Sequence, residues 1–431
     1  MVSEHIEKAM RKIEGWWEGE LIGERTCIGF VVPKPFGAHY LNRKNWRLIH
    51  WLISGHFKDL VGPLFASRKS TNNIRNVMTR KDLRSISPLV SLIYQYFNEL
   101  WPHPEEDLVD IERFVKEWAG LMGSVNYFGE EIPRLLHQFG ARGFPITMAA
   151  YLGADLTFEE DTILKKPVID IWDKFEFEIQ PPNIWYEHSL KLVELATRES
   201  KGEFLVDIPD LGDVLTNFYQ LRGHILFEEL GLNPKILEAR DRFIKLWINA
   251  YESFWKITSQ KFPGSSHWLI WAPGKSYACQ CDASCIALST CKEEVAPIIL
   301  SEIVKNFIVP EIERLGKYLD YIIWHLDGEE ELQFLDVLLE MPQIKAIQWR
   351  PICGNPADEQ WIPIFKKIQK AKKSLWLAVQ NEEEVKRLIE NLAPERLYLS
   401  GGFTGRTEEE AREFLKWVEG LTRERMKNMH F

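Results

Sequence analysis

The second half of the chain repeats one pattern five times, and this repetition constrains the fold more than any other feature. A short run rich in β-branched and aromatic residues is followed by a turn and an amphipathic helical pattern. The strand-like runs are Tyr277–Asp282, Tyr321–Asp327, Ile344–Trp349, Ser374–Val379 and Arg396–Gly401, and the helical patterns lie near 293–318, 329–341, 359–372, 381–392 and 407–423. The last helix is opened by a capping box, Thr407 with Glu410. Strict alternation of this kind predicts parallel strands joined by right-handed crossovers.

Two observations favour a closed (β/α)8 TIM barrel over an open doubly wound sheet. Further strand-like runs at Thr26–Val32, at Phe204–Ile208 and near 123–128 allow eight strands to be assembled. No G-x-G-x-x-G fingerprint follows any of them, whereas a dinucleotide-binding open sheet usually carries one. We therefore predict an α/β fold in which residues 1–431 form a single barrel, with residues 37–105 as a helical insertion within it.

The charge balance excludes several classes of partner. The chain has 63 acidic and 53 basic side chains and a formal net charge of -10, so it has no global attraction for nucleic acid or anionic lipid. No apolar run reaches the roughly 18 residues that cross a bilayer, and the N-terminus lacks the apolar stretch of a secretory signal. We expect a cytoplasmic protein without a membrane or nucleic-acid partner, its six cysteines kept as thiols.

The barrel hypothesis places the chemistry at the carboxyl ends of the strands. Side chains alternate along a strand, so His325 and Asp327 share one face, whereas Trp324 and Leu326 share the face beneath the helices. An imidazole beside a carboxylate can move a proton or bind a metal. The alternative is a buried His–Asp hydrogen bond that only orders the strand end. Asp282 also ends a strand-like run and joins this set.

A cysteine cluster and a polar loop complete the candidate features. The cluster contains Cys279, Cys281, Cys285 and Cys291. If Asp282 faces the mouth of the barrel, alternation turns Cys279 and Cys281 toward the helices, which favours apolar packing over a zinc site. The loop from Asp210 to Asp213 follows a strand-like run and leads to Tyr219 and Arg222. It is either part of the functional face or a loop held by an Arg–Asp pair.

These motifs together resemble the uroporphyrinogen decarboxylase superfamily, which includes corrinoid-linked, zinc-dependent methyltransferases. The resemblance is specific from about residue 201 onward, with weaker similarity around Trp16, Trp17 and Arg25. It rests on Asp210-Leu211-Gly212-Asp213, Leu221-Arg222-Gly223, Gln280-Cys281-Asp282-Ala283-Ser284, His325-Leu326-Asp327-Gly328, Leu335-Asp336 and Ile347-Gln348-Trp349. It implies a single (β/α)8 barrel and an uncharacterised branch near the trimethylamine corrinoid protein-like members.

Two departures from the family pattern limit what the resemblance implies. The decarboxylase carries an arginine-rich motif after its first strand, where this chain supplies only Lys34. The zinc methyltransferases carry His-x-Cys, where this chain has His325-Leu326-Asp327, and a late cysteine that the loop 400–405 lacks. Zinc would need the harder donors His325, Asp327 and Asp282.

We therefore expect an enzyme that transfers a methyl group from a small organic substrate linked to a corrinoid or tetrapyrrole partner. Its catalytic or ligand set would be Asp282, His325 and Asp327. The substrate-binding set would be Asp210, Asp213, Tyr219, Arg222, Trp349 and Arg350. Two alternatives stay open: uroporphyrinogen-type decarboxylation using Arg222, Arg350 and Arg142, and a non-catalytic corrinoid- or partner-binding barrel. The sequence also leaves open a bound zinc ion, a corrinoid protein as partner and a homodimer.

Overall fold

The computed structural model describes residues 2–34, 111–123, 125–135, 147–158, 163–281, 296–351, 354–405 and 407–429. The predicted helical insertion at 37–105 lies outside the described residues. So do Asp282 and Arg142.

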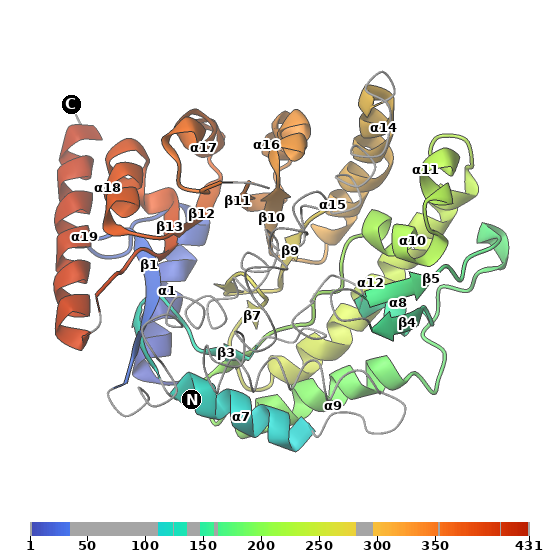
Figure 1. Ribbon diagram of the computed structural model, residues 1–431, viewed down its shortest axis with the longest axis horizontal. Helices are drawn as coiled ribbons and strands as arrows, with labels where there is room; N and C mark the ends of the chain where they lie inside the picture. The colour runs from blue at the N-terminus through green and yellow to red at the C-terminus, as the bar shows by residue number, and fades with distance from the viewer. Residues whose placement is uncertain are drawn as a thin grey trace, which may run out of the picture.

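A seven-stranded sheet forms the centre of the molecule, in the order β2-β1-β13-β12-β11-β10-β9 (Figure 1). The strands are β1 (Cys27–Pro33), β2 (Val125–Gly129), β9 (Ser276–Cys279), β10 (Tyr321–Asp327), β11 (Ile344–Arg350), β12 (Ser374–Val379) and β13 (Leu397–Gly401). All neighbours pair in parallel except β2, which is antiparallel to β1. The strand-like runs of the second half, and those near 26–32 and 123–128, are therefore confirmed as strands of one sheet.

The expectation of eight parallel strands in a closed ring needs correction. The run at 204–208 contributes β6 (Leu205–Val206), which pairs in parallel with β3 (Arg134–Leu135) outside the main sheet. Two antiparallel pairs complete the described strands, β4 (Asp155–Phe158) with β5 (Ile163–Lys166) and β7 (Ser265–Ser266) with β8 (Trp271–Ala272). Within the described ranges, strand pairing does not close the sheet, and β2 runs against the direction that a (β/α)8 barrel requires. The fold is mixed α/β with a mainly parallel sheet.

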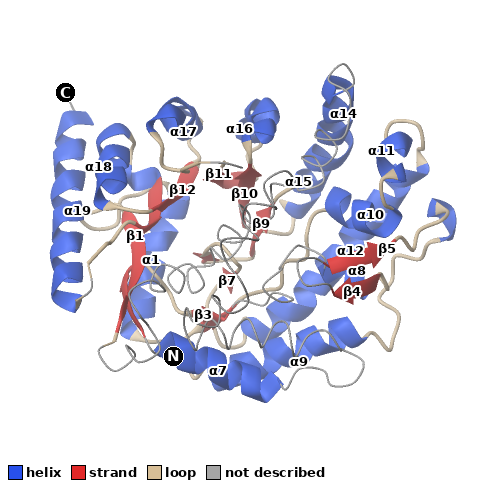
Figure 2. Ribbon diagram, viewed as in Figure 1, coloured by secondary structure: helices blue, strands red, loops and turns tan. Residues whose placement is uncertain are grey.

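The helices of the second half lie along one face of this sheet (Figure 2). They are α14 (Ala296–Ile303), the π-helical η3 (Val304–Ile308), α15 (Val309–Leu315), α16 (Leu335–Glu340), α17 (Ile362–Lys370), α18 (Glu382–Asn391) and α19 (Glu408–Met429), with 3-10 turns η4 (Glu329–Phe334), η5 (Glu359–Trp361) and η6 (Pro394–Arg396). The predicted capping box is confirmed, because Glu410 N donates to Thr407 Oγ1 at 3.2 Å and Thr407 N donates to Glu410 Oε2 at 2.9 Å.

The first helix, α1 (Glu4–Glu18), covers the amino-terminal end of β12. Trp16 Nε1 donates to the Leu375 carbonyl at 3.1 Å, and Ser374 Oγ donates to the Trp16 carbonyl at 2.6 Å. Trp17 Nε1 donates to the Trp271 carbonyl at 3.0 Å. Both indoles are buried, so the two tryptophans close this end of the strands. The carboxyl end of the sheet is therefore the end at which a site can form.

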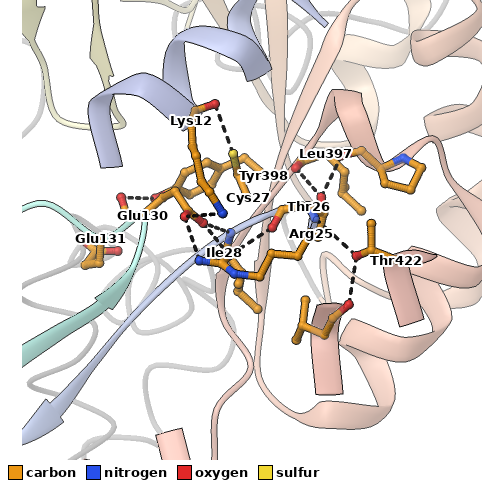
Figure 3. Close-up of polar contacts among 12 residues, drawn as sticks. Lys12, Arg25, Thr26, Cys27, Ile28, Glu130, Glu131, Leu397, Tyr398 and Thr422 are labelled. Carbon is orange, nitrogen blue, oxygen red and sulfur yellow. Dashed lines mark hydrogen bonds and ion pairs between the residues drawn. The ribbon is translucent and has the colours of Figure 1, made fainter. Parts of the chain in front are cut away.

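The first strand is fastened to the end of the chain by a buried polar cluster (Figure 3). The Arg25 guanidinium donates to both carboxylate oxygens of buried Glu130, at 2.6 and 2.7 Å. Thr26 Oγ1 donates to the Leu397 carbonyl at 2.7 Å, and Thr26 N donates to Thr422 Oγ1 at 3.3 Å. Arg25 therefore ties β1 to the segment after β2, and Thr26 ties it to β13 and α19.

The remaining helices are α7 (Ile111–Gly123), α8 (Thr147–Tyr151), η2 (Trp172–Lys174), α9 (Ile184–Glu199), α10 (Val214–Arg222), α11 (Ile225–Glu229) and α12 (Lys235–Thr258). None of the helices in the described ranges is long and apolar enough to cross a lipid bilayer.

Candidate active site

The two faces of β10 carry different chemistry. On one face the Trp324 indole donates to Glu331 at 3.3 Å and packs edge-on against Phe334 of η4, so this face lies beneath the helices. His325 and Asp327 occupy the opposite face, as their spacing predicts. We call this the inner face. The register pairs His325 with Gln348 and Asp327 with Arg350, so the inner face of β11 carries an amide and a guanidinium beside them.

A hydrogen bond to Gln348 fixes the state of the His325 ring. Nδ1 of the imidazole contacts the Gln348 amide oxygen, and the amide nitrogen of Gln348 donates to the Trp349 carbonyl at 3.2 Å. Because an amide oxygen can only accept, Nδ1 must carry the proton of the neutral ring. Nε2 then has a free lone pair, and it lies 3.8 Å from Asp327 Oδ2. The nitrogen that faces Asp327 is therefore the one that can accept a proton.

Asp327 and Arg350 form the outer part of the same cluster. Arg350 Nη1 lies 3.6 Å from Asp327 Oδ1, and their side chains are 16% and 29% exposed, whereas the His325 side chain is 3% exposed. Asp327 N also donates to Glu331 at 3.1 Å, which anchors the strand end. The cluster therefore has a buried imidazole and a partly exposed ion pair, a graded arrangement that suits proton transfer to a bound molecule.

The structure places Trp349 away from this cluster. Trp349 pairs in register with Leu326, is fully buried, and packs against Trp361 with ring centroids 4.9 Å apart. It therefore lies on the helix-covered face rather than lining a pocket, and the substrate-binding role predicted for it must be corrected. Gln348, which the prediction omitted, occupies the inner-face position instead. Alternation along β11 carries the signal that would have identified it.

Asp210 and Asp213 hold the loop before α10. Tyr277 OH donates to Asp210 Oδ1 at 2.7 Å, and Asp213 Oδ1 accepts from Thr216 N at 2.8 Å as the N-cap of α10. Buried Glu311 accepts from Val214 N at the same helix end. Burial and the neighbouring Asp213 raise the pKa of the Glu311 carboxyl well above its ordinary value. The described contacts of both aspartates are thus with the protein's own framework.

Tyr219 and Arg222 face α11 rather than the inner face of the sheet. The Arg222 guanidinium donates to Glu229 at 2.7 and 3.2 Å and to the carbonyls of Ile169 and Asp170 at 2.7 and 2.9 Å. Tyr219 OH contacts His224 Nε2 at 3.2 Å. Helices α10 and α11 lie far to the right of β10 and β11 in Figure 1. The loop-tying interpretation of Arg222 is supported, with Glu229 in place of the expected aspartate.

The described residues do not complete the thiolate zinc site that the family resemblance implies. Cys279 lies on the face that carries Glu311 and Asp213, both of which, after burial, raise the pKa of its thiol. On the inner face His325 and Asp327 supply two donors, where catalytic zinc takes three protein ligands. Among the described residues no group of three or more His, Cys, Asp or Glu could hold a metal ion. Asp282, the third predicted member, lies outside the described residues.

A second buried polar cluster was not predicted from the sequence. Ser266 Oγ donates to Asp207 Oδ1 at 2.5 Å, and Arg134 lies 3.7 Å from the other carboxylate oxygen and donates to the His267 carbonyl at 2.6 Å. Burial raises the pKa of Asp207 to about 6 despite Arg134 and Ser266. Burial, with Arg134 nearby, lowers the pKa of His267 to about 3. These residues come from β3, β6 and β7, whose strands are too short to give a periodic signal.

One cavity of the described region lies apart from both clusters. It has a volume of about 470 Å³ and is lined by residues that include His5, Lys34, Asn126 and Arg412. None of the predicted site residues lines it, so its position gives no support to a role in the predicted chemistry.

Comparison with known proteins gives little beyond this geometry. No protein-family model and no curated protein matches the chain. Among solved structures, a methyltransferase from Methanosarcina mazei superposes with a TM-score of 0.48 at 9% sequence identity, covering 96% of this chain and 98% of that one. This likeness is too weak to assign a family or an activity.

Proposed function

We propose that the chain is an enzyme that transfers a methyl group between a small organic substrate and a corrinoid carried by a partner protein. The proposal includes completion of the (β/α)8 barrel and a site at the carboxyl ends of β9, β10 and β11. It rests on one observation: a buried His325 whose Nδ1 is fixed by Gln348 and whose Nε2 faces Asp327 on the inner face. The sequence motifs around 280–284, 325–328 and 347–349 support it by resemblance.

The protein's own residues would manage the proton in this reaction. When the methyl group leaves a nitrogen, oxygen or sulfur of the substrate for the corrinoid cobalt, the electron pair of the broken bond stays on that heteroatom. A proton must then reach the heteroatom, and His325 Nε2 can deliver it after taking it from solvent through Asp327. Arg350 keeps Asp327 ionised between turnovers and orients it.

Decarboxylation has less support from the described residues. That alternative needed several free arginines to hold carboxylates. Arg222 is held by Glu229 and two carbonyls, Arg350 faces Asp327, and Arg142 lies outside the described residues.

The test follows methylation of cobalamin by absorbance. Purified protein is mixed with cob(I)alamin and a panel of methyl donors: trimethylamine, methanol, dimethyl sulfide and 2-methoxyphenol. We expect donor-dependent methylcobalamin formation that falls at least about a hundredfold in His325→Gln and about tenfold or more in Asp327→Asn. The surface variant His224→Gln serves as a matched control and keeps the parent rate. An unchanged rate in His325→Gln, or no methylation with any donor, would contradict the proposal.

A further inference from the structure

The inner face at β9–β12 is built in two layers of different polarity. The register aligns His325 with Gln348 and Gln348 with Trp376, and the Trp376 ring stacks on Tyr398 with an interplanar angle of 5°. These four side chains are buried and uncharged, because burial also raises the pKa of the Tyr398 phenol well above its ordinary value. We call them, with Gln280, the floor layer. Asp327 and Arg350 lie one step further toward the carboxyl ends and are partly exposed.

Gln280 belongs to the floor layer on the β9 side. Cys279 pairs with Trp324 in the parallel register, so the next residue, Gln280, lies level with His325. Cys279 and Tyr277 both turn toward the loop and helix that carry Asp210 and Glu311, so alternation directs Gln280 to the inner face. Three neighbouring strands thus present an amide, an imidazole and an amide side by side.

The Gln280 amide has unmet hydrogen-bonding capacity. The residue is 2% exposed, and neither its amide nitrogen nor its amide oxygen has a hydrogen-bond partner among the described residues. A buried amide normally satisfies both atoms, since leaving them unpaired is costly. By contrast, the neighbouring Gln348 uses its oxygen on His325 and its nitrogen on a backbone carbonyl. Gln280 therefore offers a ready donor and a ready acceptor, in one plane, beside the reactive imidazole.

The positions above the aromatic half of the floor are occupied by small residues. Ala378 pairs with Ser400, and Ser400 pairs with Gly29, so β12, β13 and β1 present little side-chain bulk at the level of Asp327. Bulk and charge are concentrated on the β10 and β11 side. The arrangement leaves a neutral, hydrogen-bonding floor reached past a charged rim.

We propose that Gln280 binds the substrate through a paired hydrogen bond to an uncharged carboxamide or lactam group. Such a group carries an N–H and a C=O on adjacent atoms, and the amide of Gln280 complements both. A carboxylate would pair only with the Gln280 nitrogen, would face the amide oxygen with a lone pair, and would place a charge in the uncharged floor layer. The inference deepens the proposed function, because it names the substrate class of that site.

The experiment combines stability with fragment binding. Ligand-detected saturation-transfer NMR is recorded with propionamide and, separately, with propionate, on the parent, on Gln280→Met and on the control Gln333→Met at an exposed position. We expect a propionamide signal in the parent and in the control, a decrease of at least fivefold in Gln280→Met, and a weaker propionate signal throughout. We also expect Gln280→Met to unfold at no lower temperature than the parent.

Each contrary result overturns the inference. Equal propionamide signals in the parent and Gln280→Met, no propionamide signal in the parent, or preference for propionate would each contradict it. Unfolding of Gln280→Met several degrees below the parent would show that another part of the chain satisfies the amide. Loss of the proposed methyl transfer with Gln280-dependent propionamide binding intact would count against the proposed function alone.

Discussion

The Gln348 amide oxygen accepts a hydrogen bond from Nδ1 of His325, and this contact decides which ring nitrogen is available for chemistry. The Gln348→Leu variant removes the acceptor, so the ring loses its fixed tautomer. We expect the ¹⁵N resonances of the His325 ring, assigned by their absence in His325→Gln, to move from the Nδ1–H pattern toward a mixed tautomer. Any methyl-transfer rate should fall about tenfold to a hundredfold, as when a partner that orients a reactive imidazole is removed.

Gln333→Leu is the matched control for this change, because Gln333 is an exposed residue whose side chain contacts only the nearby Glu330 carbonyl among the printed bonds of its segment. It should leave the ring resonances unchanged. A His325 spectrum that is the same in parent and Gln348→Leu would show that Gln348 does not set the tautomer.

Trp349 should behave as a core residue. Its ring is fully buried against Trp361 on the helix-covered face, so Trp349→Ala should lower the free energy of unfolding by about 3–5 kcal/mol. Urea unfolding measures this cost, and half-buried Trp417→Ala is a milder reference. Trp349→Phe should keep propionamide binding at the parent level. Weakened binding in Trp349→Phe without a stability loss would return Trp349 to the site.

Arg222 should contribute to stability through Glu229 and not to substrate binding. The guanidinium is 14% exposed and makes charge-assisted bonds to Glu229 and to two backbone carbonyls. We expect Arg222→Ala to cost about 1–2 kcal/mol of unfolding free energy. A double-mutant cycle with Glu229→Gln should give non-additive losses, and donor KM should not change. A raised KM with additive stability losses would indicate a binding role.

The sequence predicted the strands well because the signal is local. Alternation and βα spacing located β10, β11, β12 and β13 to within one or two residues, and they also placed His325 and Asp327 on one face. The same rule was not carried to β11. Its strand runs to Arg350, one residue beyond the predicted end, so Gln348 and Arg350 share the inner face while Trp349 packs beneath the helices.

Features that depend on distant pairing could not be obtained this way. Nothing in the run near 123–128 states that β2 would turn antiparallel to β1, because strand direction is set by the connection and not by the residues of the strand. Arg134 and Asp207 meet although 73 positions separate them, and neither lies in a periodic segment. The unmet amide of Gln280 likewise becomes visible only when the surrounding atoms are placed.

The buried Asp207 should give the protein a pH-dependent stability of defined sign. Its pKa is raised from 3.8 to about 6, chiefly by burial, so the folded state holds the proton more tightly than the unfolded chain. The resulting stabilisation is complete below about pH 3.8 and is lost as the pH rises through about 6. The loss amounts to about 3 kcal/mol from a shift of this size. Asp207→Asn cannot titrate and should lack this contribution.

The measurement is urea unfolding of parent and Asp207→Asn at several pH values between 4 and 8. The lowered pKa of His267 acts in the opposite direction, destabilising the fold as the pH falls from 6.5 toward 3, but it is present in both proteins and cancels in their difference. Loss of the carboxylate beside Arg134 adds a roughly constant offset. The unfolding free energy of Asp207→Asn relative to the parent should therefore increase by up to about 3 kcal/mol as the pH rises from 4 to 7. The exposed Asp336→Asn should show no such trend, and a flat difference for Asp207→Asn would mean that the carboxyl group titrates alike in the folded and unfolded chains.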